Sequence, residues 1–491
     1  MPEKLGLGEY RGNAVIRTPA LKFEIVRWDW NTGSARDANP IDITPAVFSF
    51  RWMKSLRNPE SGCELSMISQ FAGTHYLDSL NPMDVLKVYE FGTLKYLGFI
   101  RRIAGSGSIS QAGTPNRSVS ISCSSFGALF SEGQLGLNMF LKVGKERDFK
   151  ASLELLQKDF KDLVVDGKSY AEMVGLAVDT WLKFIGNCGA TKYEKYFSTW
   201  INYDAGLKGK AIPGVPMSWQ LFYGTEQSIT LWDVLHKLVQ SPFNEVWFDC
   251  GPRNVWVENN KGLSGKPGEI SLTDEKEHLI VRAPPFDGTV IDKAKNDLWE
   301  SLPARTIPLS YLTRFDLNKS MDESASFYLV APPIYNPGEL ALIAMGKFEM
   351  DTKAFNKYLY RPMVQDLYFS RILEPGDVAT QGHEKEIYDD AQDKAATLKN
   401  WNEHNDEYLS GALTFMVPSD EKFDPRIGDR LEVEGITDAS FYVEGVSHSW
   451  TYGGSLTSNV SVTRGWGLRG PIELKDKIFK RGIFSMGESF K

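Results

Sequence analysis

The chain has few of the residue types that most often carry catalysis or metal binding. Its 491 residues include six histidines and four cysteines. The cysteines form no CxxC pair and lie far apart, a spacing that excludes both a zinc knuckle and a dense disulfide framework. We therefore expect buried free thiols at Cys63, Cys123, Cys188 and Cys250.

No catalytic or phosphate-binding motif is complete. His383 begins His-Glu-Lys-Glu, but Ile387 stands where an HExxH zinc site needs its second histidine. His448 lies in Gly-Val-Ser-His-Ser, which lacks the second glycine of a nucleophile elbow, and the surrounding pattern predicts a strand. Neither glycine-rich segment, 6–8 or 105–107, has the Gly-Lys-Ser/Thr of a phosphate-binding loop. The sequence thus predicts no catalytic residue, no cofactor and no metal ion, and we do not expect an enzyme.

Long apolar runs and an excess of basic charge are also missing. The formal net charge is −8, whereas proteins that recognise nucleic acids need a basic surface to displace counterions from phosphates. The longest apolar run, residues 340–345, is far shorter than the roughly 20 residues that span a bilayer. The first residues contain no stretch typical of a signal peptide. We expect a protein without a membrane segment that folds in the cytoplasm.

Two distant segments of the chain share one pattern. Each has a proline, then Asp-x-Leu-x-Val, then a glycine before an apolar strand, then a Val-Ser-Ile/Val strand. We interpret the pattern as one module written twice, and a chance likeness of two antiparallel meanders is the alternative. The matched positions are Asp84, Leu86, Val88 and Gly98 in the first copy and Asp429, Leu431, Val433 and Gly445 in the second.

Apolar residues alternate with polar ones in these segments, which is typical of half-buried antiparallel strands. Further strands are predicted upstream of each copy, at 21–25 and 47–52 before the first and at 311–317 and 326–330 before the second. Each copy therefore has enough strands for a small barrel or sandwich.

Apolar residues spaced three and four apart predict helices elsewhere, at 151–163, 171–185, 231–239 and 387–408, and a hairpin is predicted from 245–249 and 254–257. The predicted fold class is α+β and multidomain, with two similar antiparallel β-barrel (tube-type) domains and helical and mixed α/β insertions. The predicted division is a first barrel at 14–130, a helical insertion at 131–240, a mixed α/β peripheral domain at 241–304, a second barrel at 305–345 plus 411–465, a helical insertion at 346–410 and a C-terminal tail at 466–491.

Three stretches of the chain carry further motifs, at 242–249 together with 281–287, at 305–320 and at 441–465. In this order they resemble the baseplate hub proteins of contractile phage tails and tailocins, the late control D-like family, in the form found in phages of Gram-positive hosts. One is similar to that family's PFNE and RxxPFD pair, with Ala283 at a position where a threonine-like turn residue is more usual. The others are 305–320 and 441–465, while the tail after 465 has no counterpart. The residues that carry the first motif are Pro242, Phe243, Asn244, Glu245, Arg282, Pro285, Phe286 and Asp287.

Hub proteins of this family form trimers in which each subunit places two similar barrels in a ring. The resemblance therefore implies a homotrimer whose six barrels join a three-fold central spike to a six-fold tail tube. The implied partners are the spike protein, the tail tube or tube-initiator protein, the baseplate wedge proteins and the tape measure protein, with DNA passing through the channel without sequence-specific binding. The implied location is the tail baseplate of a virion or a tailocin particle.

Two other functions stay open. Carboxylate pairs such as Asp389 with Asp390, and Glu432 with Glu434, are what a tail-associated peptidoglycan hydrolase would use. The 13 tryptophans are compatible with a receptor-binding or carbohydrate-binding tail protein, since sugar sites favour exposed aromatic side chains. Four of them lie on apolar stripes, however, and we expect those to pack inside, namely Trp181, Trp232, Trp247 and Trp256.

Overall fold

The fold is described from a computed structural model of the chain. It describes residues 19–135, 195–201, 229–239, 244–331, 348–366, 381–417, 424–433 and 439–467, together with 175 and 178, with short internal gaps at 30–31, 33, 38, 110–114, 133, 261–265, 284, 286–296 and 323. The helix predicted at 151–163 and nearly all of that at 171–185 lie outside these residues. Within the described ranges, no helix is both long enough and apolar enough to cross a membrane.

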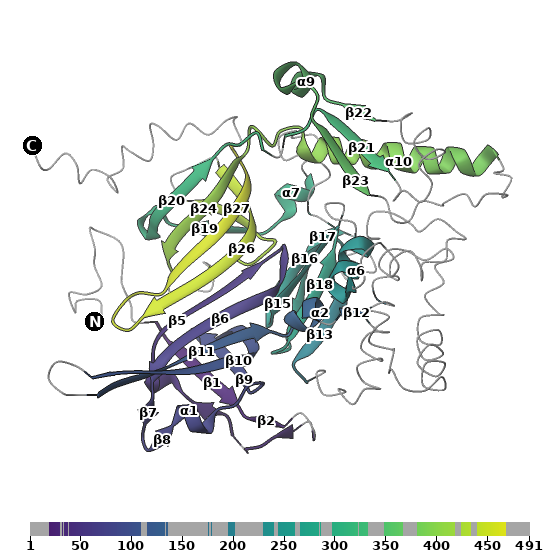
Figure 1. Ribbon diagram of the computed structural model, residues 1–491. Coiled ribbons are helices and arrows are strands. Elements are labelled where there is room, and N and C mark those ends of the chain that lie inside the picture. The colour runs from purple at the N-terminus through teal and green to yellow at the C-terminus, as the bar shows by residue number, and fades with distance from the viewer. Residues whose placement is uncertain are drawn as a thin grey trace, which may run out of the picture.

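The largest element is a sheet of thirteen strands, in which neighbours are antiparallel except for β19 and β25. Its main path runs β20-β24-β27-β26-β5-β6-β11-β10-β9-β1-β4, and β25 and β19 continue from β26. Figure 1 labels these strands except β4 and β25. The strands are β1 (Leu21–Val26), β4 (Ile41–Asp42), β5 (Val47–Ser55), β6 (Asn58–Ile68), β9 (Val85–Glu90), β10 (Thr93–Ile109), β11 (Pro115–Ser125), β19 (Ala304–Ile307), β20 (Leu312–Asn318), β24 (Leu409–Met416), β25 (Arg430–Val433), β26 (Ala439–Thr451) and β27 (Thr457–Gly467).

The sheet consists of two strand sets, purple to blue and green to yellow in Figure 1. The first strand set has the order β1-β9-β10-β11-β6-β5, and the second strand set has the order β19-β25-β26-β27-β24-β20. The two-residue strand β4, which pairs with β1 at the edge of the sheet, belongs to neither set. When the six strands of each set are numbered along the chain, the two orders are the same. One difference is that β1 runs antiparallel to β9, whereas β19 runs parallel to β25.

Alternation of apolar and polar residues produces these strands, as predicted. Leu86 and Val88 in β9, and Leu431 and Val433 in β25, are buried, with charged or half-buried residues between them. In β5 the buried side chains of Phe50 and Trp52 also alternate with exposed ones. One hydrophobic cluster contains residues of both strand sets, so the two sets share a core.

A second group of strands packs beside the first strand set (Figure 1). β15 (Glu245–Cys250) pairs with β18 (Glu277–Arg282), which pairs with β13 (Phe197–Ile201), while β16 (Arg253–Asn260) pairs with β17 (Lys266–Leu272). The predicted hairpin between 245–249 and 254–257 is therefore wrong. Every residue of β15 and β18 is buried, and each pairs along its full length with the other, so β15 has its neighbour from a later part of the chain.

The strand predicted at 326–330 exists but lies in a different sheet from the one expected. β21 (Phe327–Ala331) pairs with β22 (Glu349–Met350) and β23 (Pro362–Asp366), and it is β24 that pairs with β20. α10 (Gln381–Asn402) packs on this small sheet through the buried side chains of Ala395 and Leu398. Among its described residues, the predicted helical insertion at 346–410 thus contains helices α9 (Thr352–Tyr358) and α10, the strands β22 and β23 and the first residues of β24.

The other helices of the described ranges are short. The helix predicted at 231–239 is confirmed as α6 (Leu231–Val239), and it begins where the Asp233 carboxylate accepts a hydrogen bond from Thr230 N at 2.9 Å. The remaining elements are small and are α1 (Tyr76–Ser79), α2 (Ala128–Glu132), α7 (Asp297–Ser301), 3-10 turns at Thr44–Ala46 and Leu309–Tyr311, and two-stranded pairs of β2 (Trp28–Asp29) with β3 (Ser34–Ala35), β7 (Gln70–Phe71) with β8 (Thr74–His75) and β12 (Gln134–Leu135) with β14 (Ile229–Thr230).

Candidate functional site

The two strand sets meet where β26 pairs with β5. Gly445–Thr451 of β26 runs antiparallel to Ser49–Ser55 of β5, and this ladder joins the sheets of the two sets into one. His448 lies opposite Trp52, with ring centroids 4.4 Å apart. We call this ladder the joint.

A buried polar cluster lies behind the joint. Glu90, at the end of β9, accepts hydrogen bonds from Nε1 of Trp52 at 2.7 Å and shares one with Nδ1 of His448 at 2.6 Å. All three side chains are buried. His448 is thus a residue within the sheet, as predicted, and its ring is held by a carboxylate of the other strand set.

A second buried cluster ties the joint to β15. Lys54 of β5 donates to Oδ1 of Asp249 at 2.6 Å, and Arg253 pairs with the other carboxylate oxygen. Burial alone would raise the pKa of Asp249, but the charges of Lys54, Arg253 and Arg426 hold that pKa well below its usual value. Asp249 therefore stays ionised, and its negative charge pairs with cations of β5 and β16.

Arg426 extends this cluster to the second strand set. Its Nε donates to Asp424 at 2.9 Å, its Nη1 donates to the carbonyl of Cys250 at 3.2 Å, and Asp424 also pairs with Lys95 of β10. Burying charged groups costs little folding free energy only when each group is paired with an opposite charge. These pairs therefore fix the positions of β10, β15 and the segment before β25 relative to one another.

The two halves of the PFNE and RxxPFD pair meet in space. Arg282 donates from Nε to Glu245 at 3.0 Å and from Nη2 to the carbonyl of Gly428 at 2.9 Å, and Tyr442 donates to Glu245 at 2.5 Å. Arg282 is 1% exposed, and it also stacks on Trp247. Asn244 donates to the carbonyl of Val239. The predicted motif therefore clamps β15 and β18 to the turn before β25.

Not every residue of that motif can be placed. Pro285 is buried beside Ala283, whereas Pro242, Phe243, Phe286 and Asp287 lie outside the described residues. The segment expected to be a mixed α/β peripheral domain contributes Trp247 and Ile280 to the hydrophobic cluster that also contains residues of both strand sets.

The two Asp-x-Leu-x-Val segments begin with the same turn. Asp84 accepts from Asn81 N at 2.9 Å and Asp429 accepts from Arg426 N at 3.1 Å, each three residues back. Met83 and Gly428, one residue before each aspartate, both have positive φ, 71° and 84°. Each aspartate carbonyl then accepts from the next long strand, from Ile100 N at 2.8 Å and Val443 N at 3.1 Å.

The strand register gives the residue-by-residue match. Gly98 lies opposite Leu86, whereas Phe441 lies opposite Leu431. Phe441 therefore holds the place of Gly98, and Gly445 lies four residues farther along β26. Both long strands have a bulge just beyond the matched pair, after Ile100 in β10 and after Val443 in β26.

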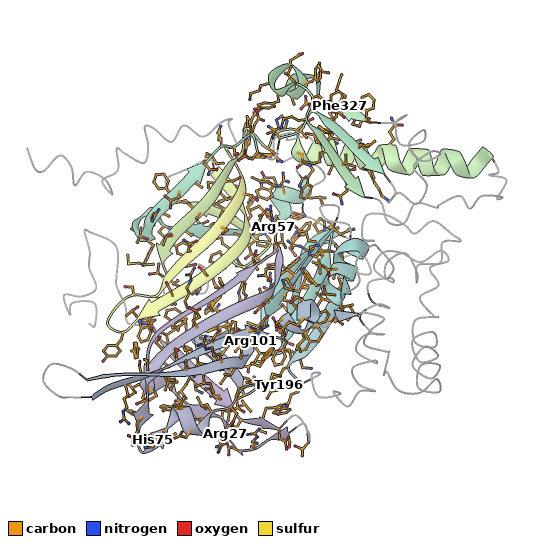
Figure 2. All side chains as sticks on the ribbon, in the orientation of Figure 1. Arg27, Arg57, His75, Arg101, Tyr196 and Phe327 are labelled. Carbon is orange, nitrogen blue, oxygen red and sulfur yellow. The ribbon has the colours of Figure 1, made fainter. Side chains whose placement is uncertain are left out.

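A pocket of about 290 Å³ lies between β26, β27, α10 and β15, and two carboxylates line it, Glu245 and Glu444. Glu444 accepts from the Thr463 hydroxyl at 3.0 Å and pairs with Arg57, which Figure 2 labels where the strand sets and β15–β18 meet. Glu245 is held by Arg282 and Tyr442. Both carboxylates are thus engaged by protein donors, which favours a structural role for them.

Other expectations can be compared with the structure. Three of the cysteines are buried and free, as predicted, and Cys188 lies outside the described residues. Within the described ranges no cluster of histidine, cysteine or carboxylate side chains could hold a metal ion. The tryptophans expected inside are buried where the chain is described, namely Trp232, Trp247 and Trp256, and Trp181 lies outside.

Sequence reasoning missed the residues that hold the joint. Lys54, Asp249 and Glu90 are separated by long stretches of chain, and no local motif marks them. The available signal was a charged residue on the buried side of a strand, such as Lys54 in line with Phe50 and Trp52.

No family model matches the chain, and no curated protein matches it. Among solved structures, it is similar to a tail protein from Neisseria meningitidis (10% identity, 91% of this chain and 97% of that one, TM-score 0.47). It is also similar to the 43 kDa tail protein of prophage MuSo2 from Shewanella oneidensis (10%, 91% and 98%, TM-score 0.45) and to an E. coli type VI secretion component (10%, 87% and 75%, TM-score 0.35). At these values the likenesses do not by themselves assign a function.

Proposed function

We propose that the chain is a structural, non-enzymatic hub in the baseplate of a contractile phage tail or tailocin. In this proposal the two strand sets are copies of one tube-type barrel, and the chain trimerises to present six such barrels to a six-fold tail tube while holding a three-fold spike. Within each subunit the predicted tube domains comprise 14–130 and 305–345 plus 411–465.

One observation carries the proposal, namely that two strand sets with the same strand order are joined edge to edge in one sheet. The matching turns at Asp84 and Asp429 and the matching bulges of β10 and β26 support common descent of the two sets. A chain that carries one module twice turns a three-fold oligomer into a six-fold surface, which is what a spike-to-tube adapter needs.

The remaining partners follow from the hub assignment. The tube or tube-initiator protein and the tape measure protein would contact the ring of barrels, and wedge proteins would contact the outer insertions, which include α9 and α10. DNA would pass through the ring without sequence-specific binding, and the net charge of −8 suits such a channel because it does not attract phosphates.

The test is the mass and symmetry of the assembled protein. Light scattering on the full chain, alone and with its spike, is expected to give a complex containing three copies of 55.2 kDa, about 166 kDa before the spike is counted. Electron microscopy of the particle end is expected to show three-fold density below six similar lobes. A chain that stays monomeric throughout assembly would contradict the proposal.

A tail-associated peptidoglycan hydrolase that uses a pair of carboxylates is the second candidate. Zymography on purified peptidoglycan separates the two proposals, since a hub gives no clearing. Glycan binding by the isolated chain would favour the third candidate, a receptor-binding tail protein.

A further inference from the structure

The joint inside the chain can be compared with two other strand edges of the same sheet. It forms between one edge of β26 and one edge of β5. The strands that hold the same places in the opposite sets are β10 and β20. Each of these has an edge with no partner strand in the part of the chain that the structure describes, because β10 pairs with β9 only as far as Phe99 and β20 pairs only with β24.

The equivalence of these edges is exact to the residue in the ladder register. One row of neighbours crosses the first strand set from Ile103 through Ile121 and Leu65 to Phe50. The matching row crosses the second strand set and consists of Val446, Val460, Leu413 and Phe315. Ile103 therefore holds the place of Val446, and Phe315 holds the place of Phe50.

The bulges agree with this register at both ends of the row. The β5–β6 ladder shifts register between Val47 and Ser49, and the β20–β24 ladder shifts register between Leu312 and Arg314. In both strands the shift lies between the third and the first residue before the matched phenylalanine. The free stretch of β10, residues 102–108, thus corresponds to Gly445–Thr451 of β26, and residues 314–320 correspond to Ser49–Ser55 of β5.

The composition of the free β10 edge suits a partner strand. Exposed edges in monomeric proteins are normally blocked by charge, proline or a covering element. The free stretch has one charged residue, Arg102 at its start, and residues 103–108 are Ile, Ala, Gly, Ser, Gly and Ser, without charge or proline; residues 105–107 are exposed. On β20, Phe315 and Leu317 are only half-buried, whereas Phe50 and Trp52, their counterparts in the joint, are 3% and 4% exposed.

We propose that β10 of one copy of this chain pairs antiparallel with β20 of the next copy, in the register of the internal joint. That register places Ala104 opposite Asn318, Ser106 opposite Asp316 and Gly107 opposite Phe315. The contact is head to tail, so each copy offers a β20 edge at one end and a β10 edge at the other. It depends on the proposed function only for the number of copies that close the ring.

Engineered disulfides test the register directly. Ala104→Cys with Asn318→Cys, and separately Ser106→Cys with Asp316→Cys, place thiols directly opposite one another across the proposed ladder. The matched control is Ala104→Cys with Arg314→Cys, which keeps the same face but moves one thiol four residues along, about 13 Å. Each purified full-length variant is oxidised with oxidised glutathione, which becomes reduced as the disulfide forms, and is run on a non-reducing gel.

The expected result is disulfide-linked chains from both in-register pairs, with products ending at three copies, and at least tenfold less product from the control. A trimer by light scattering without in-register cross-links, or with equal cross-linking of the control, overturns the β10–β20 contact and leaves the hub proposal standing. In-register cross-links that extend beyond three copies support the contact and contradict the trimer. A monomer that forms no cross-links contradicts both.

Discussion

His448 and Glu90 are separated by 358 positions in the sequence, and Nδ1 of His448 lies 2.6 Å from Oε2 of Glu90. Glu90 belongs to the first strand set and His448 to the second, and both side chains are 1% exposed. Neither strand set alone supplies both groups. The pair therefore makes the burial of each residue depend on the joint being formed.

Replacing His448 by leucine is expected to destabilise the protein by about 1–3 kcal/mol, because Glu90 loses one of its buried hydrogen-bond partners. A double-mutant cycle with Glu90→Leu is expected to show a coupling energy of about 0.5–3 kcal/mol. Urea unfolding measures both quantities. His75→Leu, at an exposed position of β8, is the control and is expected to change stability by less than about 0.5 kcal/mol. Purely additive single and double mutants would show that the pair does not couple the sets.

Arg282→Met is expected to cost about 3–5 kcal/mol of unfolding free energy, since it leaves the buried carboxylate of Glu245 without its cation. Lys22→Met removes an ion pair at the protein surface and is the control, which is expected to change the unfolding free energy far less because water screens exposed charges. Thermal or chemical unfolding of the two variants makes the comparison. Equal effects of the two substitutions would contradict the clamp assigned to Arg282.

Glu277 gives the protein a pH dependence that can be isolated. Burial raises the pKa of this carboxyl to about 7, although the backbone amides of Phe126 and Gly127 donate to it. A raised pKa means that the folded state favours the proton, so this stability is fully present below pH 4.5 and is lost as the pH rises to about 7. Between pH 4.5 and about pH 7, the unfolding free energy of the unsubstituted chain is expected to fall by on the order of 3 kcal/mol relative to that of Glu277→Gln. Unfolding free energies at a series of pH values test this, and parallel curves for the two proteins would be the contrary result.

The turns before Asp84 and Asp429 have positive φ at the same position, where one has Met83 and the other Gly428. Met83 has φ of 71°, which costs a side-chain-bearing residue about 1–2 kcal/mol, and glycine stands at the matching place, 428. Met83→Gly is expected to be neutral or to stabilise by up to about 1 kcal/mol.

The reverse substitution, Gly428→Met, is the matched comparison for that turn. It is expected to destabilise by more than about 3 kcal/mol, because a Cβ there would lie 2.4 Å from Nη2 of Arg282. Melting temperatures rank the two variants. A loss of stability from Met83→Gly as large as that from Gly428→Met would contradict the equivalence of the turns.

Much of the local structure could be predicted from sequence, because alternation of apolar and polar residues depends only on a strand's neighbours along the chain. The strands that contain Leu86, Val88, Leu431 and Val433 and the helix at 231–239 are examples. The likeness of the segments after Asp84 and Asp429 was also visible, because short spacings survive in a linear pattern. Their register was not visible, since two similar spacings along the chain do not show which residues lie opposite one another: Gly98 lies opposite Leu86, and Phe441, not Gly445, lies opposite Leu431.

Only the tertiary structure decided which strands become neighbours. The strand at 327–331 pairs with β22 and β23, and α10 covers the sheet that they form. Its own alternating sequence does not distinguish this small sheet from the large one. The joint likewise depends on Lys54, Asp249 and Glu90, which need partners far away in the chain. A buried charge is stable only where folding brings its counter-charge, and that meeting is a property of the whole chain and not of any one segment.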